Sequence, residues 1–151
     1  MRRLIGLILA VAAISPAHAM GQKPKLAVTL STCSSGATAP ERSLMVSASM
    51  PAGSSTHRMS MRFELYQKLP GSTTTFRRVK LPAWNPWVKS DPGVSGFVFQ
   101  RTVDSLFSPA NYKVVVRFRW YNAAGKRTKS KAKTSKVCRQ TSKATNTTPS
   151  L

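Results

Sequence analysis

Residues 112–121 read YKVVVRFRWY, and this stretch decides the fold class. Every second side chain from Tyr112 to Trp120 is large and apolar, whereas Lys113, Arg117 and Arg119 fall at the alternate positions. Successive side chains of a β-strand point to opposite faces, so this alternation predicts a strand with one buried face and one basic face. The following residues 122–125 (NAAG) predict a short turn, with a glycine available for a positive φ.

The same period of two recurs along the rest of the chain, and no stretch after the first 20 residues has a convincing helical period. Further strands are predicted at residues 26–31, 44–50, 58–66, 75–81, 97–103 and 126–138, with turn-rich segments between them. Seven short strands separated in this way predict an all-β fold in which two sheets form a sandwich.

A sequence motif around the sixth predicted strand resembles a known family. Its residues are Leu106, Tyr112, Val114, Val116, Asn122 and Gly125, similar to the Leu…Tyr-x-Val-x-Val…Asn…Gly signature of fibronectin type III and related immunoglobulin-like domains. Pro109 stands one place later than the family's proline, and the family's early-strand tryptophan is missing. The chain also resembles exported immunoglobulin-like domains of bacteria, some of them grouped as adhesion-related.

This resemblance implies a seven-stranded immunoglobulin-like (fibronectin type III-like) sandwich over residues 20–139. It implies that the third, sixth and seventh strands share a sheet. It further implies that Tyr112 forms a tyrosine corner, in which the hydroxyl bonds back to the preceding loop. Because a fold of this kind hosts many functions, the resemblance alone assigns none.

The N-terminus reads as a bacterial signal peptide. Arg2 and Arg3 precede an apolar run at residues 4–14, and Ala17-His18-Ala19 matches the small-x-small cleavage pattern. We expect cleavage after Ala19 and a secreted or cell-envelope protein of residues 20–151, ending in a disordered polar tail at 140–151. An uncleaved membrane anchor is the alternative, but the run is about half the length that spans a bilayer. No later segment is apolar enough to cross a membrane.

Two cysteines, Cys33 and Cys138, are present in the chain. An even count in an exported protein predicts a disulfide, with two buried free thiols as the alternative. In the implied topology both cysteines fall near the far ends of neighbouring first and last strands. Cys33 is out of phase with the inward positions that end at Leu30, so the pairing also predicts a β-bulge or a change of sheet between them.

The charge is strongly positive. The chain has 24 basic and 4 acidic residues, and without Arg2 and Arg3 the 22 remaining basic residues leave a net charge of +18. We expect a basic outward sheet face that binds a polyanion. Its candidate residues are Arg62, Lys68, Lys113, Arg117, Arg119, Arg127, Lys129, Lys131 and Lys133. Tyr66 and Tyr121 would lie among them.

The expected partner is an anionic wall polymer, an anionic lipid surface or an acidic polysaccharide. Nucleic acid is disfavoured, because no nucleic-acid-binding module is recognisable. The alternative is a structural or protein-interaction domain in which charge only keeps the chain soluble and lysines protect an edge strand. In that case a protein partner would bind at an edge strand or at the tryptophan loop.

The tryptophan loop, residues 81–88, contains Trp84 and Trp87 between prolines. These rings could stack on a sugar or a partner, or could close the open end of the sandwich by packing into the core.

No catalytic, cofactor or metal site is predicted. After Ala19 the only histidine is His57, and the four acids, among them Glu41 and Glu64, are widely separated. No nucleophile motif or metal-ligand spacing is present. We therefore expect a non-catalytic binding or adhesion-type module.

Overall fold

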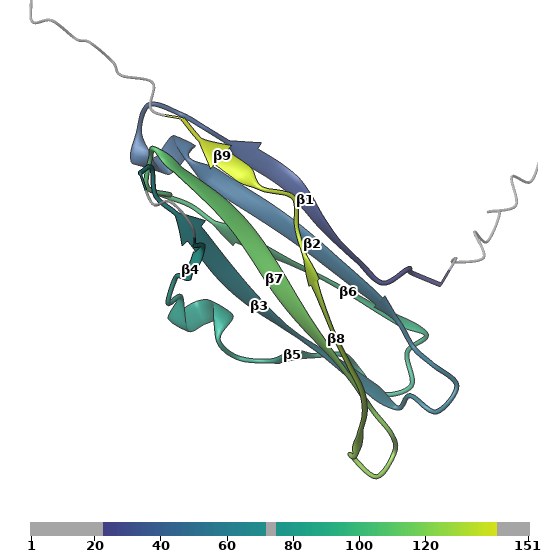
Figure 1. The fold of residues 1–151 in the computed structure, drawn as a ribbon. Helices are drawn as coiled ribbons and strands as arrows, with labels where there is room; N and C mark the ends of the chain where they lie inside the picture. Colours follow the sequence, from purple (N-terminus) through teal and green to yellow (C-terminus); the bar gives the residue numbers. More distant parts are fainter. Residues whose placement is uncertain (1–22, 72–74, 142–151) are drawn as a thin grey trace, which may run out of the picture.

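The strands form a two-layer β-sandwich, and the long strands bury every second side chain between the layers (Figure 1). The computed structural model describes residues 23–71 and 75–141. The strands in these residues are β1 (Ala27–Ser34), β2 (Ser43–Pro51), β3 (Arg58–Lys68), β4 (Arg77–Arg78), β5 (Val88–Lys89), β6 (Gly96–Val103), β7 (Ala110–Tyr121), β8 (Arg127–Thr134) and β9 (Cys138–Gln140). Two 3-10 helices, η1 (Ala39–Glu41) and η2 (Pro82–Trp84), lie in the connections.

The strands form two antiparallel sheets. One has the order β1-β2-β6, and the other has the order β4-β3-β7-β8, with β5 added to β3 and β9 added to β7. The third, sixth and seventh predicted strands correspond to β3, β7 and β8, so the prediction that they share a sheet is confirmed. Every second residue of β2 and β7 is buried, and the two inward faces meet in one apolar core.

The predicted strand positions agree with the structure except at three places. The predicted strand at residues 75–81 is reduced to the two residues of β4, and β5 was not predicted. The last predicted strand, 126–138, is broken into β8 and β9 after Thr134. At the break the backbone N–H of Ser135 donates to the carbonyl of Val114 and its hydroxyl accepts from the Val114 N–H.

Cys33 and Cys138 form a disulfide, as predicted, with a Cα–Cα distance of 5.5 Å. The predicted β-bulge is also confirmed, because the β1–β2 register shifts between Leu30 and Thr32. This shift places both Leu30 and Cys33 opposite buried residues of β2. The irregularity before β9 likewise turns Cys138 toward the core, because Cys138 pairs with the inward-facing Tyr112.

The tyrosine-corner hydrogen bond is present. The hydroxyl of Tyr112 donates to the carbonyl of Phe107 at 3.1 Å and accepts from the side-chain amide of Gln67 at 2.7 Å. Tyr112 itself is buried, which is the main cause of a raised pKa for its phenol. In the turn after β7, Gly125 has a φ of 73°, the conformation predicted for it.

The last strand extends one residue beyond the predicted domain boundary at residue 139. Gln140, predicted to begin the tail, belongs to β9 and donates from its side chain to the carbonyl of Ser34. The rest of the predicted tail and the predicted signal peptide at 1–19 lie outside the described residues. Within the described residues, no helix has the length and apolar character that crossing a bilayer requires.

Candidate functional site

The outward face of the β4-β3-β7-β8 sheet carries ten of the 21 lysines and arginines that the structure describes. Directly opposite residues of antiparallel strands share a face, and Arg62 lies opposite Arg117, while Tyr66 lies opposite Lys113. We call this surface the outer basic face. By strand register its basic residues are Arg58, Arg62, Lys68, Arg78, Lys89, Lys113, Arg117, Arg119, Arg127 and Arg139.

Six of the nine predicted polyanion-binding residues lie on the outer basic face: Arg62, Lys68, Lys113, Arg117, Arg119 and Arg127. Sequence reasoning missed Arg58, Arg78, Lys89 and Arg139 as members. Alternation along β3 was enough to find Arg58, which is in phase with Arg62. Arg139 is in phase with Arg127 by simple alternation, but the predicted strand ended at residue 138; in the structure the extra residue Thr128 and the irregularity before β9 cancel, which leaves Arg139 on this face.

The sequence pattern predicts that Arg127, Lys129, Lys131 and Lys133 all lie on this face. This prediction is wrong for the three lysines. Lys129, Lys131 and Lys133 lie opposite the inward-facing Trp120, Phe118 and Val116, so they occupy the inner side of β8. The cause is a register shift that leaves Thr128 as an extra residue between Arg127 and Lys129. The shift keeps Arg127 on the outer basic face. It also brings the ammonium of Lys129 to 5.2 Å from the Trp120 ring centre.

One carboxylate sits at the centre of the outer basic face. Glu64 is buried, and its oxygens lie 2.8 Å from Arg62 Nη2, 3.1 Å from Arg117 Nε and 3.8 Å from Arg78 Nη2. Burial raises the pKa of Glu64, but hydrogen bonds and charge from Arg117 and Arg62, and the charge of Arg78, outweigh it. The pKa therefore lies below its ordinary value of 4.5. Glu64 holds these arginines together across three strands.

The two tryptophans of the loop have separate positions. Trp84 is buried and packs edge-on against the core residue Phe63, so of the two alternatives left open for this ring the structure has packing into the core. Trp87 is half-buried on the outer basic face, where the guanidinium carbons of Arg119 and Arg62 lie 3.9 and 5.1 Å from its ring centre. Such cation–π contacts hold the flexible arginines in place.

Phe76 is the second aromatic ring on this surface. The ammonium of Lys113 lies 4.3 Å from its centre. The rings of Phe76 and Trp87 are thus both in contact with cations of the protein itself. Tyr66 and Tyr121 are further aromatic side chains of this face, opposite Lys113 and Arg58.

Within the described residues, three hollows lie on the outer basic face, and the smallest, of about 320 Å³, is lined by Lys68, Phe76, Asn111, Val137 and Arg139. Another, of about 460 Å³, lies where Ser130 and Ala132 of β8 stand beside Arg117 and Arg119, and Trp87, Arg127, Phe118 and Lys131 complete its lining. The small side chains of β8 leave space there in which the guanidinium groups are accessible.

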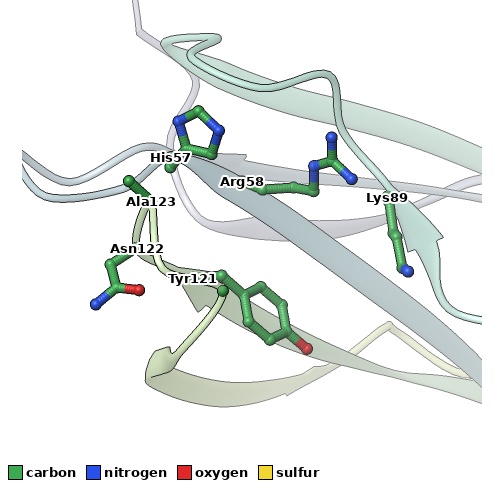
Figure 2. Close-up of a pocket in the computed structure, with 7 residues that line it drawn as sticks. His57, Arg58, Lys89, Tyr121, Asn122 and Ala123 are labelled. Atoms are coloured by element: carbon green, nitrogen blue, oxygen red, sulfur yellow. The ribbon is translucent and has the colours of Figure 1, made fainter.

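The second hollow, of about 410 Å³, lies at the end of the sheet (Figure 2). Its lining residues are His57, Arg58, Lys89, Tyr121, Asn122, Ala123 and Gly125. The first two come from the start of β3, Lys89 from β5, and the rest from the end of β7 and the turn after it. Every one of the five polar side chains can donate a hydrogen bond.

Metal-binding groups were sought across residues 23–71 and 75–141. No cluster of three or more histidine, cysteine, aspartate or glutamate side chains is found there. Glu41 lies in η1, and its carboxylate accepts a hydrogen bond from the backbone N–H of Thr38. That hydrogen bond is the main cause of its lowered pKa.

The fold and this surface together define an all-β, disulfide-bonded sandwich with one basic sheet face. No family model, curated protein or solved structure matches the chain.

Proposed function

We propose that this chain is an exported immunoglobulin-like domain that binds an anionic polymer of the cell envelope or extracellular matrix through the outer basic face. The sheet order and the hydrogen bond from Tyr112 to Phe107 support the immunoglobulin-like assignment. The disulfide supports export, because such bonds persist in oxidising compartments. The signal-peptide pattern of residues 1–19 supports it independently.

The observation that carries the proposal is the separation of charge between the two sheet faces. The outward positions of the β1-β2-β6 sheet form three rows: Ala27-Ser49-Val98, Thr29-Ser47-Gln100 and Thr32-Met45-Thr102. None of these nine residues is charged, whereas the opposite sheet carries ten cations. Solubility depends on net charge and not on its placement, so charge serving only solubility has no reason to gather on one face.

The dimensions of the outer basic face suit an elongated ligand. β3 spans Arg58–Lys68, which at about 3.3 Å per residue gives a surface roughly 33 Å long. Cations occur along its whole length, and its one carboxylate, that of Glu64, is fully engaged by arginines. A flexible polyanion lying along the strands would therefore meet successive cations without meeting a free negative charge.

Binding to purified envelope polymer across a salt series tests the proposal. Each polymer charge neutralised by a cation contributes roughly 0.7–0.9 to the slope of log K against log salt for nucleic acids, and a similar effect is expected for other dense polyanions. We expect strong binding at low salt and a steep decline as salt increases. Anionic lipid vesicles serve as a second ligand. Tighter binding to vesicles than to polymer would assign the face to membranes instead.

Two variants with the same loss of charge locate the binding surface. The first replaces Lys113, Arg119 and Arg127 with glutamine on the outer basic face. The second replaces Lys129, Lys131 and Lys133 with glutamine on the inner side of β8. We expect the first variant to lose at least about tenfold in affinity with a shallower salt slope, and the second to lose much less. Equal losses would show that net charge alone governs binding and would overturn the proposal.

A further inference from the structure

We propose that the hollow at the end of the sheet (Figure 2) is a site for a phosphoryl group. This inference rests on the proposed function and names the chemistry of the anion: a phosphate ester carried on a sugar or polyol. The residues that line the hollow differ from the arginines that form ion pairs with Glu64 and cation–π contacts with Trp87.

The strand register brings the donors of the hollow together. Arg58 on β3 lies directly opposite Tyr121 on β7, so their side chains share the outer face. Lys89 on β5 pairs with Ser60, which is one position along the same face from Arg58. The guanidinium, the ammonium and the phenol therefore come from three adjacent strands. Figure 2 shows Arg58, Lys89 and Tyr121 around one space, whereas the side chain of Asn122 points away from these three.

These donors have no partner among the described residues of the protein. No hydrogen bond or ion pair joins the side chains of Arg58, Lys89 or Tyr121 to another described group, in contrast to Arg62 and Arg117, which are bound to Glu64. The side-chain oxygen of Asn122 accepts from the backbone N–H of Lys126, so its amide has only N–H groups left to offer.

The electrostatics of the hollow favour an anion. Two cations, Arg58 and Lys89, line it and no carboxylate does. Like charges that share a site repel each other, and a bound anion would turn this repulsion into attraction. The lining therefore selects a group that is negatively charged and only accepts hydrogen bonds.

A phosphoryl group fits this lining better than a carboxylate. Guanidinium groups bind phosphate through two parallel hydrogen bonds, which leaves further phosphate oxygens for the ammonium and the phenol. A carboxylate has two oxygens and cannot satisfy as many donors at once. The volume of about 410 Å³ exceeds what one phosphoryl group needs, so the sugar or polyol that carries it can enter as well.

Titration of the purified protein with inorganic phosphate, followed by NMR at backbone amides, tests the site. We expect saturable shifts centred on His57, Ala123 and Gly125. The variant Arg58→Gln/Lys89→Gln should weaken phosphate binding by at least about tenfold. The matched control, Lys68→Gln/Arg139→Gln, removes the same charge from the far end of the outer basic face and should change it by less than about twofold.

Two results would overturn the inference. Shifts that spread evenly over the outer basic face, or an equal effect of the two variants, would indicate diffuse counter-ion binding only. Tighter binding of glucuronate than of phosphate would assign the hollow to carboxylates. Arg58, Lys89 and Arg139 are exposed and Lys68 is half-buried, so unchanged unfolding midpoints are expected for both variants and confirm that each variant folds.

The polymer-binding assay on the same variants separates this inference from the proposed function. Intact polymer binding with no saturable phosphate shift would overturn the phosphate site alone. Saturable phosphate binding in a protein that does not bind envelope polymer would support the site and overturn the proposed function.

Discussion

Lys131 lies directly opposite Phe118 in the β7–β8 pair, so an exposed lysine occupies the same side of the sheet as a fully buried phenylalanine. Lys129 and Lys133 repeat this relationship with Trp120 and Val116. β8 pairs with β7 alone over Arg127–Thr134, and all eight of its residues are exposed. Inward-pointing charges on such an edge hinder the addition of a further strand.

The first prediction concerns these three lysines. Replacing Lys129, Lys131 and Lys133 with threonine should make β8 a flat, uncharged edge with high β-propensity. We expect this variant to self-associate at concentrations where the original protein is monomeric, as measured by light scattering during size-exclusion chromatography. The control replaces Lys68, Lys113 and Arg139 with threonine, which removes the same charge from the outer basic face. Equal self-association of both variants would attribute the effect to net charge.

The second prediction concerns Glu64. The substitution Glu64→Gln leaves Arg62 and Arg117 directly opposite each other without the carboxylate that joins them. Because these arginines are partly exposed, we expect a cost of about 1–3 kcal/mol in the free energy of unfolding at pH 7, measured by urea denaturation. The freed guanidinium groups should also bind anionic polymer more tightly. Unchanged stability would mean that solvent already screens the three arginines from one another.

The pH dependence of stability gives a third prediction. The pKa of Glu64 is lower in the folded protein than its ordinary value of 4.5. Its contribution to stability is therefore present above about pH 4.5 and is lost as the pH falls through the lower, folded-state pKa. We expect the difference in unfolding free energy between the original protein and Glu64→Gln to be largest near neutral pH and to shrink in acid. A difference that stays constant down to pH 2 would contradict the ion-pair explanation.

The fourth prediction concerns the tyrosine corner. Tyr112→Phe removes the hydroxyl that accepts from Gln67 and donates to the Phe107 carbonyl. Loss of two part-buried hydrogen bonds should lower the free energy of unfolding by about 1–3 kcal/mol, without an effect on polymer binding. Chemical denaturation measures the first quantity and the salt-series binding assay the second. Reduced polymer binding in a variant that remains folded would show that this end of the sandwich contributes to the site.

The fifth prediction separates the two loop tryptophans. Trp84→Ala should cost about 3–5 kcal/mol in unfolding free energy, because Trp84 is buried against Phe63. Trp87→Leu should cost only about 1 kcal/mol but weaken polymer binding, because Arg62 and Arg119 lose the ring that positions them. Any change in tryptophan fluorescence on adding polymer should come from Trp87. Such a change persisting in Trp87→Leu would place the ligand elsewhere.

Much of the fold could be predicted from the sequence because the alternation is strong where the strands are regular. In β7 the apolar positions from Tyr112 to Trp120 are all buried, as the pattern indicates. The disulfide followed from the presence of two cysteines, and the bulge near Cys33 followed from its phase. The first argument needs only the number of cysteines, and the second needs only the spacing between Cys33 and the preceding apolar residues.

The errors arise where one residue changes the phase of a strand. The extra residue Thr128 places three lysines on the opposite side of the sheet from the predicted one. The sequence around Thr128 contains no feature that predicts this register shift. The role of Glu64 depends on Arg78 and Arg117, which are distant in sequence and come together only through strand pairing. The short strands β4 and β5 are held by their pairing with β3, and two residues carry no periodicity.

The disulfide also determines how the domain would respond to mechanical load. Cys33 and Cys138 are separated by 105 positions in sequence and lie near the two ends of the described chain. Tension applied between those ends would pass through the covalent bond and bypass the enclosed strands. At about 3.4 Å per residue the bond withholds roughly 350 Å of chain from extension, so only the short segments outside the two cysteines could be drawn out. A domain that holds its ligand on an enclosed sheet would keep that sheet folded while being pulled.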